Sequence, residues 1–168
     1  MVGKTKNDSF YLQSFKGCLT FAESHKNMRC IYDGANNYQD IRSQNIIVND
    51  LLKKGIDGLL ISITDSEFLA KDSLQALKEN NIPVITFDSD LLPEHQKFRL
   101  AYVGTDNFNF GKALGTYIKK FAKQDDNYLC LLSGHSSAPN LNERIAGVRY
   151  ALSEQRTERL SGKNGWLE

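Results

Sequence analysis

Hydrophobic and polar positions along the chain alternate between two patterns: stretches with the periodicity of a helix and short, nearly continuous apolar runs. Apolar residues recur at the three-to-four-residue spacing of a helix over Ser9 to His25 and again over Tyr38 to Lys54. Asp8 or Ser9 can cap the first of these helices, and Gly55 is placed to end the second. The pattern therefore predicts two amphipathic helices in the first third of the chain.

Short, nearly continuous apolar runs separate the helical stretches and predict buried strands. The predicted strands are Met1 to about Thr5, Met28 to Ala35, Gly58 to Ser62, Pro83 to Asp88, Ala101 to Asp106 and Tyr128 to Gly134. Further helices are predicted after Thr64, from about Asn107 to Ala122, and near Asn140 to Ser153. Apolar strands that alternate with helices indicate a parallel sheet covered on both faces, which is the doubly wound α/β fold class.

Composition narrows the function classes without selecting one. The 168 residues carry 21 basic and 20 acidic side chains, and the net charge of +1 is spread without long runs of one sign. This balance argues against a nucleic acid or an anionic membrane as a partner held by bulk charge. No apolar run approaches the roughly 20 residues of a membrane span, so direct membrane insertion is not expected. The opening MVGKTKND lacks the apolar stretch of a secretion signal.

The three cysteines give no sign of a metal or redox motif. Cys18, Cys30 and Cys130 sit singly among apolar neighbours, with no CxxC pair and no histidine at ligand spacing. We expect them to be buried, unpaired thiols, and we expect neither a metal nor any other cofactor.

In a doubly wound sheet, ligands bind outside the carboxyl ends of the strands, so residues that follow strands are the candidates for a site. Here they are short, polar and often acidic, with two adjacent aromatic residues at one edge. The candidates of this kind include Asp8, Phe10, Tyr11, Ser62, Asp88 and Ser89. Such a mixture suits a polyhydroxylated ligand, because carboxylates accept from hydroxyl groups and an aromatic ring covers the C–H face of a sugar. No glycine-rich loop for phosphate follows the first strand.

Five motifs in order carry a resemblance to a known family. They are NDSFY, KKGIDGLLISITDS, NNIPVITFDSD, RLAYVGTDNFNFGKALG and NERIAGVRYAL. In this order and spacing they resemble the type I periplasmic solute-binding proteins, in particular the ribose and galactose group, over roughly residues 1 to 155. The resemblance implies a receptor of two lobes that closes over a monosaccharide, carries it to a membrane permease of an ABC-type importer or to a sensor, and performs no catalysis. It also implies a periplasmic location.

The resemblance further implies which side chains touch the sugar. It adds Asn142 and Arg144 to the six candidates above, and it places a hinge between the lobes at Thr105 and Asp106. Several positions depart from the family pattern. Asp8 stands where ribose-type members have an asparagine, and Ser62 stands where an amide side chain is frequent. Ser89 and Asn142 stand where an arginine is common. These departures leave the particular sugar undetermined.

The resemblance to this two-lobed family also predicts how the chain is divided into domains. Residues 1–105 are expected to form one α/β lobe, residues 106–155 the start of an incomplete second lobe, and residues 156–168 a polar tail. The chain is accordingly expected to be part of a longer protein and to bind sugar weakly alone. The unpaired edges of the predicted strand Tyr128 to Gly134 suggest a homodimer that pairs them between chains.

Other functions share this fold class. A sensor domain of a membrane receptor and the effector domain of a sugar-responsive repressor both remain open, and flanking sequence would separate them. A magnesium-dependent enzyme is a further alternative, because acidic residues follow several strands. The sequence has neither a DxD pair placed with a lysine nor a GxSxG nucleophile motif, so an enzyme is not expected.

Overall fold

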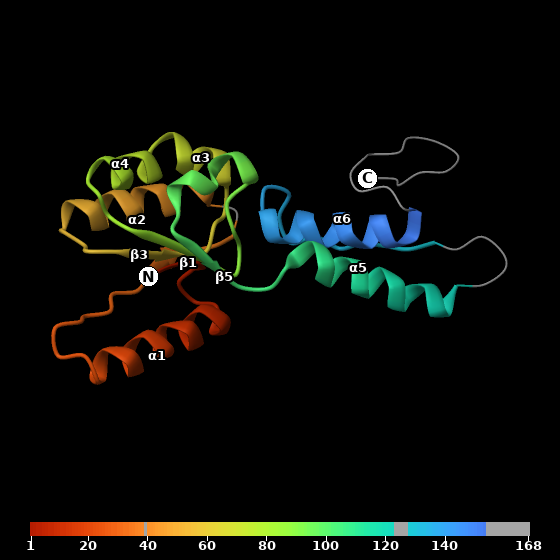
Figure 1. The fold of residues 1–168 in the computed structure, drawn as a ribbon, viewed down its shortest axis with the longest axis horizontal. Coiled ribbons are helices and arrows are strands. Elements are labelled where there is room, and N and C mark those ends of the chain that lie inside the picture. The colour runs from red at the N-terminus through yellow and green to blue at the C-terminus, as the bar shows by residue number, and fades with distance from the viewer. Residues whose placement is uncertain (39, 123–127, 154–168) are drawn as a thin grey trace. The chain divides into compact units, whose positions relative to one another are not determined.

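The computed structural model describes residues 1–38, 40–122 and 128–153, and strands alternate with helices along its first hundred residues (Figure 1). The elements in chain order are β1 (Val2–Thr5), α1 (Ser9–Glu23), β2 (Asp33–Ala35), α2 (Ile41–Lys53), β3 (Leu59–Ile61), α3 (Ser66–Lys71), α4 (Ser73–Glu79), β4 (Val84–Phe87), the 3-10 helix η1 (Pro93–Phe98), β5 (Ala101–Val103), α5 (Asn107–Ile118), the 3-10 helix η2 (Lys119–Phe121) and α6 (Pro139–Ser153). The predicted α/β alternation is confirmed.

The five strands form one parallel sheet in the order β2-β1-β3-β4-β5. The chain runs from β1 outward to β2 and then returns to the other side of β1 to continue through β3, β4 and β5. The strand order therefore reverses between β1 and β3, and a crevice outside the carboxyl ends of these strands is the usual ligand position in such sheets.

Three helices cover one face of the sheet, and α1 lies on the other (Figure 1). Side chains of α2, α3 and α4 pack on strand residues to form a core in which most members are almost completely buried. Its members are Val2, Val48, Leu51, Leu59, Ile61, Ile63, Leu69, Leu74, Leu77, Val84 and Leu91. Burial of this apolar area is the main stabilising contribution to the unit, at about 25 cal/mol per Å².

Aspartates that follow strands or turns begin four of the helices by accepting backbone N–H groups. They are Asp8, Asp40, Asp65 and Asp106. The Asp65 carboxylate, for example, accepts from the backbone N–H of Phe68 at 2.9 Å and so caps α3. Gly55 follows the end of α2 with φ of +77°, the left-handed conformation that glycine adopts without strain, so this predicted stop is also confirmed.

Two predicted elements differ in extent from those in the structure. The predicted strand Met28 to Ala35 is a strand only at Asp33–Ala35. The single helix predicted after Thr64 is two helices that meet at Asp72, whose carboxylate accepts from the side-chain amides of Asn45 (2.5 Å) and Asn49 (3.1 Å). These tertiary bonds hold Asp72 at ψ of −87°, which interrupts the helix.

The predicted strand Tyr128 to Gly134 is wrong, because residues 128–134 join no ladder in the part of the chain that the structure describes. Tyr128 and Leu132 are almost fully exposed there, at 95% and 96%. An apolar run forms a strand only where a neighbouring strand pairs with its backbone groups. The homodimer that depended on pairing this strand therefore has no support in the structure.

The expectation of three buried, unpaired thiols is also wrong. Cys18 of α1 and Cys30 form a disulfide, and Cys130 is exposed. The spacing of 12 residues gave no hint of a bond, because only the return of the chain alongside α1 brings the two sulfur atoms together. Connectivity of this kind is a tertiary property.

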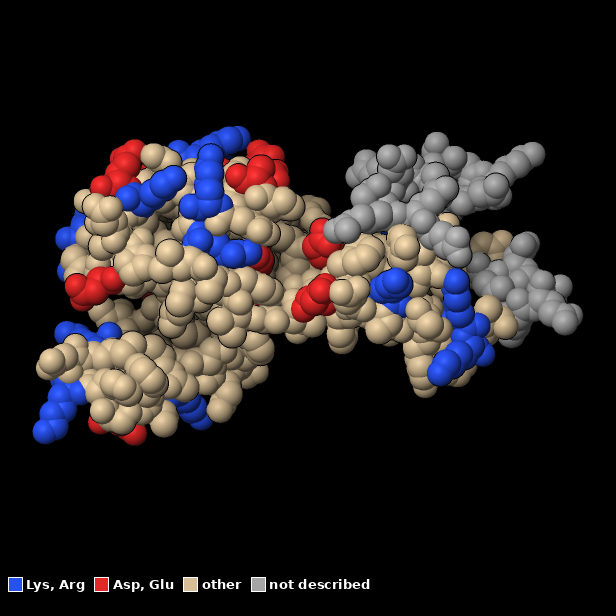
Figure 2. All heavy atoms as spheres, in the orientation of Figure 1, with Lys and Arg blue, Asp and Glu red and all other residues tan. Residues whose placement is uncertain are grey.

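The chain divides into two compact units. The first comprises Met1–Gly104 and Ser137–Pro139, and the second starts at Thr105 and includes α5 and most of α6. Figure 2 shows basic and acidic side chains interspersed over the visible face of the first unit. Residues 154–168, which include the predicted polar tail, lie outside the described residues.

Glycines determine how closely α5 and α6 pack within the second unit. A Cβ atom at Gly111 of α5 would lie 2.0 Å from the Arg144 carbonyl oxygen, and one at Gly147 of α6 would lie 2.1 Å from the Phe108 carbonyl oxygen. Since no side chain fits at these distances, the two backbones touch directly. The helix that carries Asn142 and Arg144 is thereby fixed against α5.

Within the described residues, none of the helices combines the length and the apolarity that crossing a bilayer requires.

Candidate functional site

Three of the predicted site residues meet at the carboxyl ends of β1, β3 and β4. The Tyr11 hydroxyl donates to Asp88 Oδ2 at 3.0 Å, the Ser62 hydroxyl donates to the same oxygen at 2.8 Å, and the two hydroxyl oxygens are 3.3 Å apart. We call Tyr11, Ser62 and Asp88 the polar triad. It lies where the strand order reverses, at the carboxyl ends of the strands, where the sequence predicts a ligand site.

Asp88 is held in an unusual backbone conformation at the end of β4. Its φ is +60°, which non-glycine residues seldom adopt and which aspartate tolerates better than most. The Asp88 N–H donates to the Val103 carbonyl oxygen at 3.1 Å, and its own carbonyl oxygen accepts from the Tyr102 hydroxyl at 2.9 Å. Two residues of strand β5 thus hold the Asp88 backbone in place, and the Tyr11 and Ser62 hydroxyl groups hold its carboxylate.

Gln44 supports the triad from the opposite face of the sheet, and sequence reasoning missed it. The side chain is fully buried, and its amide nitrogen donates to the carbonyl oxygens of Gly3 (3.2 Å) and Ser62 (2.8 Å). Its amide oxygen accepts from the Thr64 N–H at 3.1 Å and from the Thr64 hydroxyl at 2.7 Å. One side chain of α2 therefore joins β1 to β3 at the level of the site. The signal available in the sequence was an amide within the apolar stripe of a predicted helix.

Asp8 has both carboxylate oxygens engaged. Oδ1 accepts from the Phe10 N–H at 2.7 Å, and Oδ2 accepts a short hydrogen bond from the Tyr38 hydroxyl. Tyr38 comes just after β2 and was not predicted as a site residue. The signal in the sequence that could have found it was an aromatic residue in the turn after the strand, in GANNY.

The two adjacent aromatic residues of α1 have opposite environments. Phe10 is 53% exposed, whereas Tyr11 is 3% exposed. The Tyr11 ring packs edge-on against the rings of Phe10 and Phe87, at centroid distances of 5.2 and 6.1 Å. A Cβ atom on Gly3 would lie 2.8 Å from its Cγ, so the glycine makes room for the ring. Phe10 therefore presents an open ring face, and Tyr11 reaches the site through its hydroxyl group.

Both phenols are neutral hydrogen-bond donors at physiological pH. Burial and then the neighbouring Asp88 carboxylate raise the pKa of Tyr11 far above its ordinary value. Burial, followed by the hydrogen bond to Asp8, raises the pKa of Tyr38 to about 12. A buried tyrosine beside a carboxylate keeps its proton because ionisation would add a second negative charge.

Ser89 occupies a different environment from its neighbour Asp88. It is fully buried, and its hydroxyl oxygen has no hydrogen-bond partner among the described residues. Its carbonyl oxygen accepts from the Ile63 N–H at 3.1 Å. A ligand contact by Ser89 remains a prediction.

The remaining predicted residues belong to the second unit. The exposed Asn142 side chain donates to the Ser136 carbonyl oxygen at 2.7 Å. The Arg144 guanidinium donates to Asn107 Oδ1 at 2.8 Å and lies 5.0 Å from the centre of the Phe110 ring. Thr105 and Asp106 open this unit, and Asp106 caps α5. Their roles as ligand contacts and hinge residues stay predictions.

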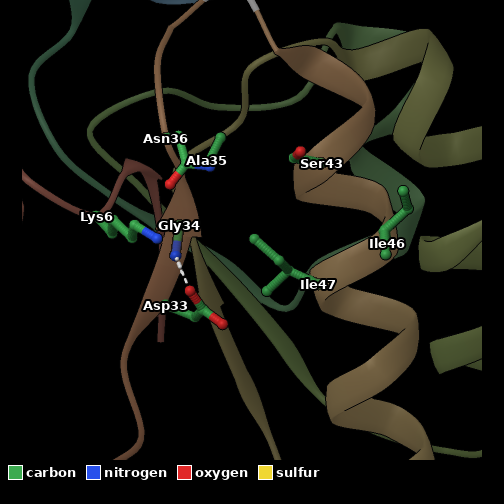
Figure 3. A pocket seen from close by; sticks show the side chains of 8 residues that line it. All are labelled: Lys6, Asp33, Gly34, Ala35, Asn36, Ser43, Ile46 and Ile47. Atoms are coloured by element: carbon green, nitrogen blue, oxygen red, sulfur yellow. Dashed lines mark hydrogen bonds between the residues drawn. The ribbon is translucent and has the colours of Figure 1, made fainter.

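A separate cavity of about 230 Å³ opens beside the edge strand β2 (Figure 3). The residues that line it are Lys6, Asp33, Gly34, Ala35, Asn36, Ser43, Ile46 and Ile47. Asp33 Oδ1 is occupied by the Gly34 N–H at 2.8 Å. No member of the polar triad lines this cavity.

The parallel sheet, the reversal of strand order and the polar triad at that point define an α/β ligand-binding lobe. Comparison with known proteins then identifies the family. Residues 1–166 match the profile of the family described as periplasmic binding protein domain, so the chain belongs to this family. The resemblance inferred from the five motifs is confirmed, and at the level of the family so is the expectation of a binding protein rather than an enzyme.

Individual relatives agree with this assignment. The chain is 27% identical over 156 residues to a D-ribose/D-allose-binding protein of Pseudomonas aeruginosa, covering 90% of this chain and 48% of the relative. A solute-binding protein of an ABC transporter from Agrobacterium vitis, solved with D-fucose, is 20% identical with a TM-score of 0.80, over 91% of this chain and 52% of the other.

A further solved structure is a solute-binding protein from Burkholderia graminis in complex with D-arabinose. It is 25% identical with a TM-score of 0.75, over 92% of this chain and 50% of the other. The chain thus spans about half the length of these relatives.

Proposed function

We propose that the protein of which this chain forms at least a part binds a monosaccharide at the carboxyl edge of the sheet. The observation that carries the proposal is the polar triad, in which the Tyr11 and Ser62 hydroxyl groups fix the half-buried Asp88 carboxylate at the edge of the sheet where ligands bind in such folds. Phe10 supplies an exposed ring beside it, able to stack on the C–H face of a sugar. The sugars named for the relatives support this class of ligand.

The proposed ligand contacts are those expected from the sequence, with different roles for the two aromatic residues. Phe10 stacks on the sugar ring, whereas Tyr11 orients the Asp88 carboxylate through its hydroxyl group. Asp8, Ser89, Asn142 and Arg144 are retained as proposed contacts on the strength of the family resemblance. Thr105 and Asp106 are retained as the proposed hinge.

The bound sugar would be delivered to the permease of an ABC-type importer outside the cytoplasmic membrane. The Cys18–Cys30 disulfide supports a periplasmic location, because disulfides persist in oxidising compartments and are rare in the cytosol. A sensor domain or a repressor effector domain would use the same site. The sequence that flanks this chain in its gene distinguishes these roles.

A thermal-shift and calorimetric screen with D-ribose, D-allose, D-fucose and D-arabinose tests the proposal. It is run on residues 1–168 and on the complete protein in parallel, since the relatives are about twice as long. We expect at least one sugar to raise the melting temperature of the complete protein. Asp88→Asn, which tolerates the same backbone conformation, should abolish the shift, and Asp57→Asn at an exposed position should preserve it. No shift with any monosaccharide would contradict the proposal.

A further inference from the structure

Helix α1 carries part of the proposed site but is attached to the sheet through few contacts. It positions Phe10 and Tyr11 and is capped by Asp8, yet Tyr11 is the one residue that it buries over its described length. Leu19 and Phe21 in its second half are 39% and 52% exposed. A Cβ atom on Gly17 would meet nothing within 4 Å. Packing alone therefore holds the helix weakly beyond its first turn.

The attachments that α1 does have lie on a single stripe of the helix. Tyr11, Phe15 and Cys18 are spaced by four and three residues, which places them on the same face over about two turns. Tyr11 contacts the sheet directly, whereas Phe15 and Cys18 contact the segment that precedes β2. The Phe15 ring stacks on Tyr32 at a centroid distance of 5.2 Å, and Cys18 is bonded to Cys30.

That segment is itself anchored to β1. The Tyr32 hydroxyl donates to the Thr5 carbonyl oxygen at 2.7 Å. The disulfide therefore links α1 covalently to a segment that is fixed on the strand leading into the site.

We propose that the Cys18–Cys30 disulfide is a positioning element of the binding site, which holds α1 on the sheet so that Phe10 and Tyr11 stay in place. The proposal rests on the function proposed above in so far as it concerns sugar. Its consequence is that the site is complete in the oxidised protein and loosens when the bond is reduced.

Reduction follows ordinary thiol–disulfide exchange with a dithiol such as dithiothreitol. One thiolate of the dithiol attacks a cysteine sulfur and forms a mixed disulfide while the other cysteine leaves as a thiolate. The second dithiol thiolate then displaces the remaining cysteine. Two electrons and two protons pass to the protein, which ends with two thiols, and the dithiol becomes a cyclic disulfide. Both cysteines are half-buried, so they are within reach of a small reductant.

Hydrogen exchange on the oxidised and the reduced protein tests the proposal without any ligand. The protein carries Cys130→Ser, which removes the exposed thiol and prevents exchange with it. Alkylation followed by mass spectrometry should find no labelled cysteine before reduction and two labelled cysteines after it; labelling of both before reduction would overturn the proposal.

On reduction, the amides of α1 should exchange about tenfold faster or more, while those of β3 (Leu59–Ile61) keep their rates. Unchanged α1 rates would overturn the proposal. Equal acceleration of α1 and β3 would also overturn it, because that result indicates a contribution to global stability only. The double variant Cys18→Ser, Cys30→Ser should reproduce the reduced state without reductant.

A binding measurement then links the result to ligand. A sugar from the panel above that stabilises the oxidised complete protein should bind the reduced form about tenfold more weakly, because part of the binding free energy goes into ordering α1. Equal affinity in the two forms would refute the link to the site. If no sugar binds either form, the proposed function fails, and the exchange rates of α1 still decide whether the disulfide positions the helix.

Discussion

The Tyr11 hydroxyl and the Asp88 carboxylate lie 77 positions apart in the sequence and are joined by a hydrogen bond of 3.0 Å. The bond connects the helix after β1 to the end of β4 across the intervening strand β3, whose Ser62 donates to the same carboxylate oxygen. A hydrogen bond to a charged acceptor stabilises more than a neutral one. This relationship fixes the proposed site before any ligand arrives.

Tyr11→Phe should lower the free energy of unfolding by about 1–3 kcal/mol, because the half-buried Asp88 carboxylate loses one of its donors while the ring packing is kept. Urea denaturation measures the change. Tyr117→Phe, at a side chain that is 55% exposed, serves as the control and should leave stability unchanged within about 0.5 kcal/mol. Equal stability of Tyr11→Phe and the parent protein would mean that the bond contributes nothing net.

Gln44→Ala should destabilise the first unit by about 2–4 kcal/mol, since it removes four hydrogen bonds in the buried interior and opens a cavity. The same denaturation experiment applies. Gln75→Ala removes an exposed amide that donates to Glu79 one turn along α4, and it should cost less than about 0.5 kcal/mol. Similar losses for the two variants would argue against the structural role of Gln44.

Gly147→Val should separate α5 from α6, because the added atoms would overlap the Phe108 carbonyl oxygen. We expect loss of hydrogen-exchange protection in α5 and α6 together, with the strands of the first unit unaffected. Gly17→Ala is the matched helical control, and it should stabilise α1 by about 0.5–1 kcal/mol since its Cβ meets open space. Protection that survives Gly147→Val would contradict the close packing of the two helices.

Stability should fall at alkaline pH because the two phenols ionise less readily when folded. The pKa of Tyr38 is raised from its ordinary value of 10.0 to about 12, and that of Tyr11 is raised further. A group with a raised folded pKa contributes its full stabilisation below the unfolded pKa and loses it as the pH rises through the folded value. The contribution of both tyrosines to the free energy of unfolding should therefore be complete at pH 8 and should decline above about pH 10.

Urea denaturation at pH 8 and pH 11 measures this decline. Tyr38→Phe should reduce the loss between the two pH values, because one of the two groups no longer titrates. A loss that is the same in the variant and the parent would show that Tyr38 does not contribute. Tyr117→Phe again provides a control at an exposed phenol.

The sequence by itself determined the alternation of strands and helices, because each element shows its own hydrophobic period over a short local range. It also determined that Asp8, Ser62 and Asp88 follow or end strands, which was enough to place them near one edge of a parallel sheet. The family followed from the order of five motifs along the chain, each of them local.

Only the tertiary structure decided the relationships that depend on distant segments. Gln44 looked like an ordinary helical amide until β1 and β3 placed carbonyl groups around it. Cys18 and Cys30 looked like isolated thiols until the chain returned beside α1, and the run from Tyr128 looked like a strand although no neighbour pairs with it. Hydrophobic periodicity reports which face of an element is buried, whereas hydrogen bonds, disulfides and ladders need two segments to meet, and no local pattern encodes that meeting.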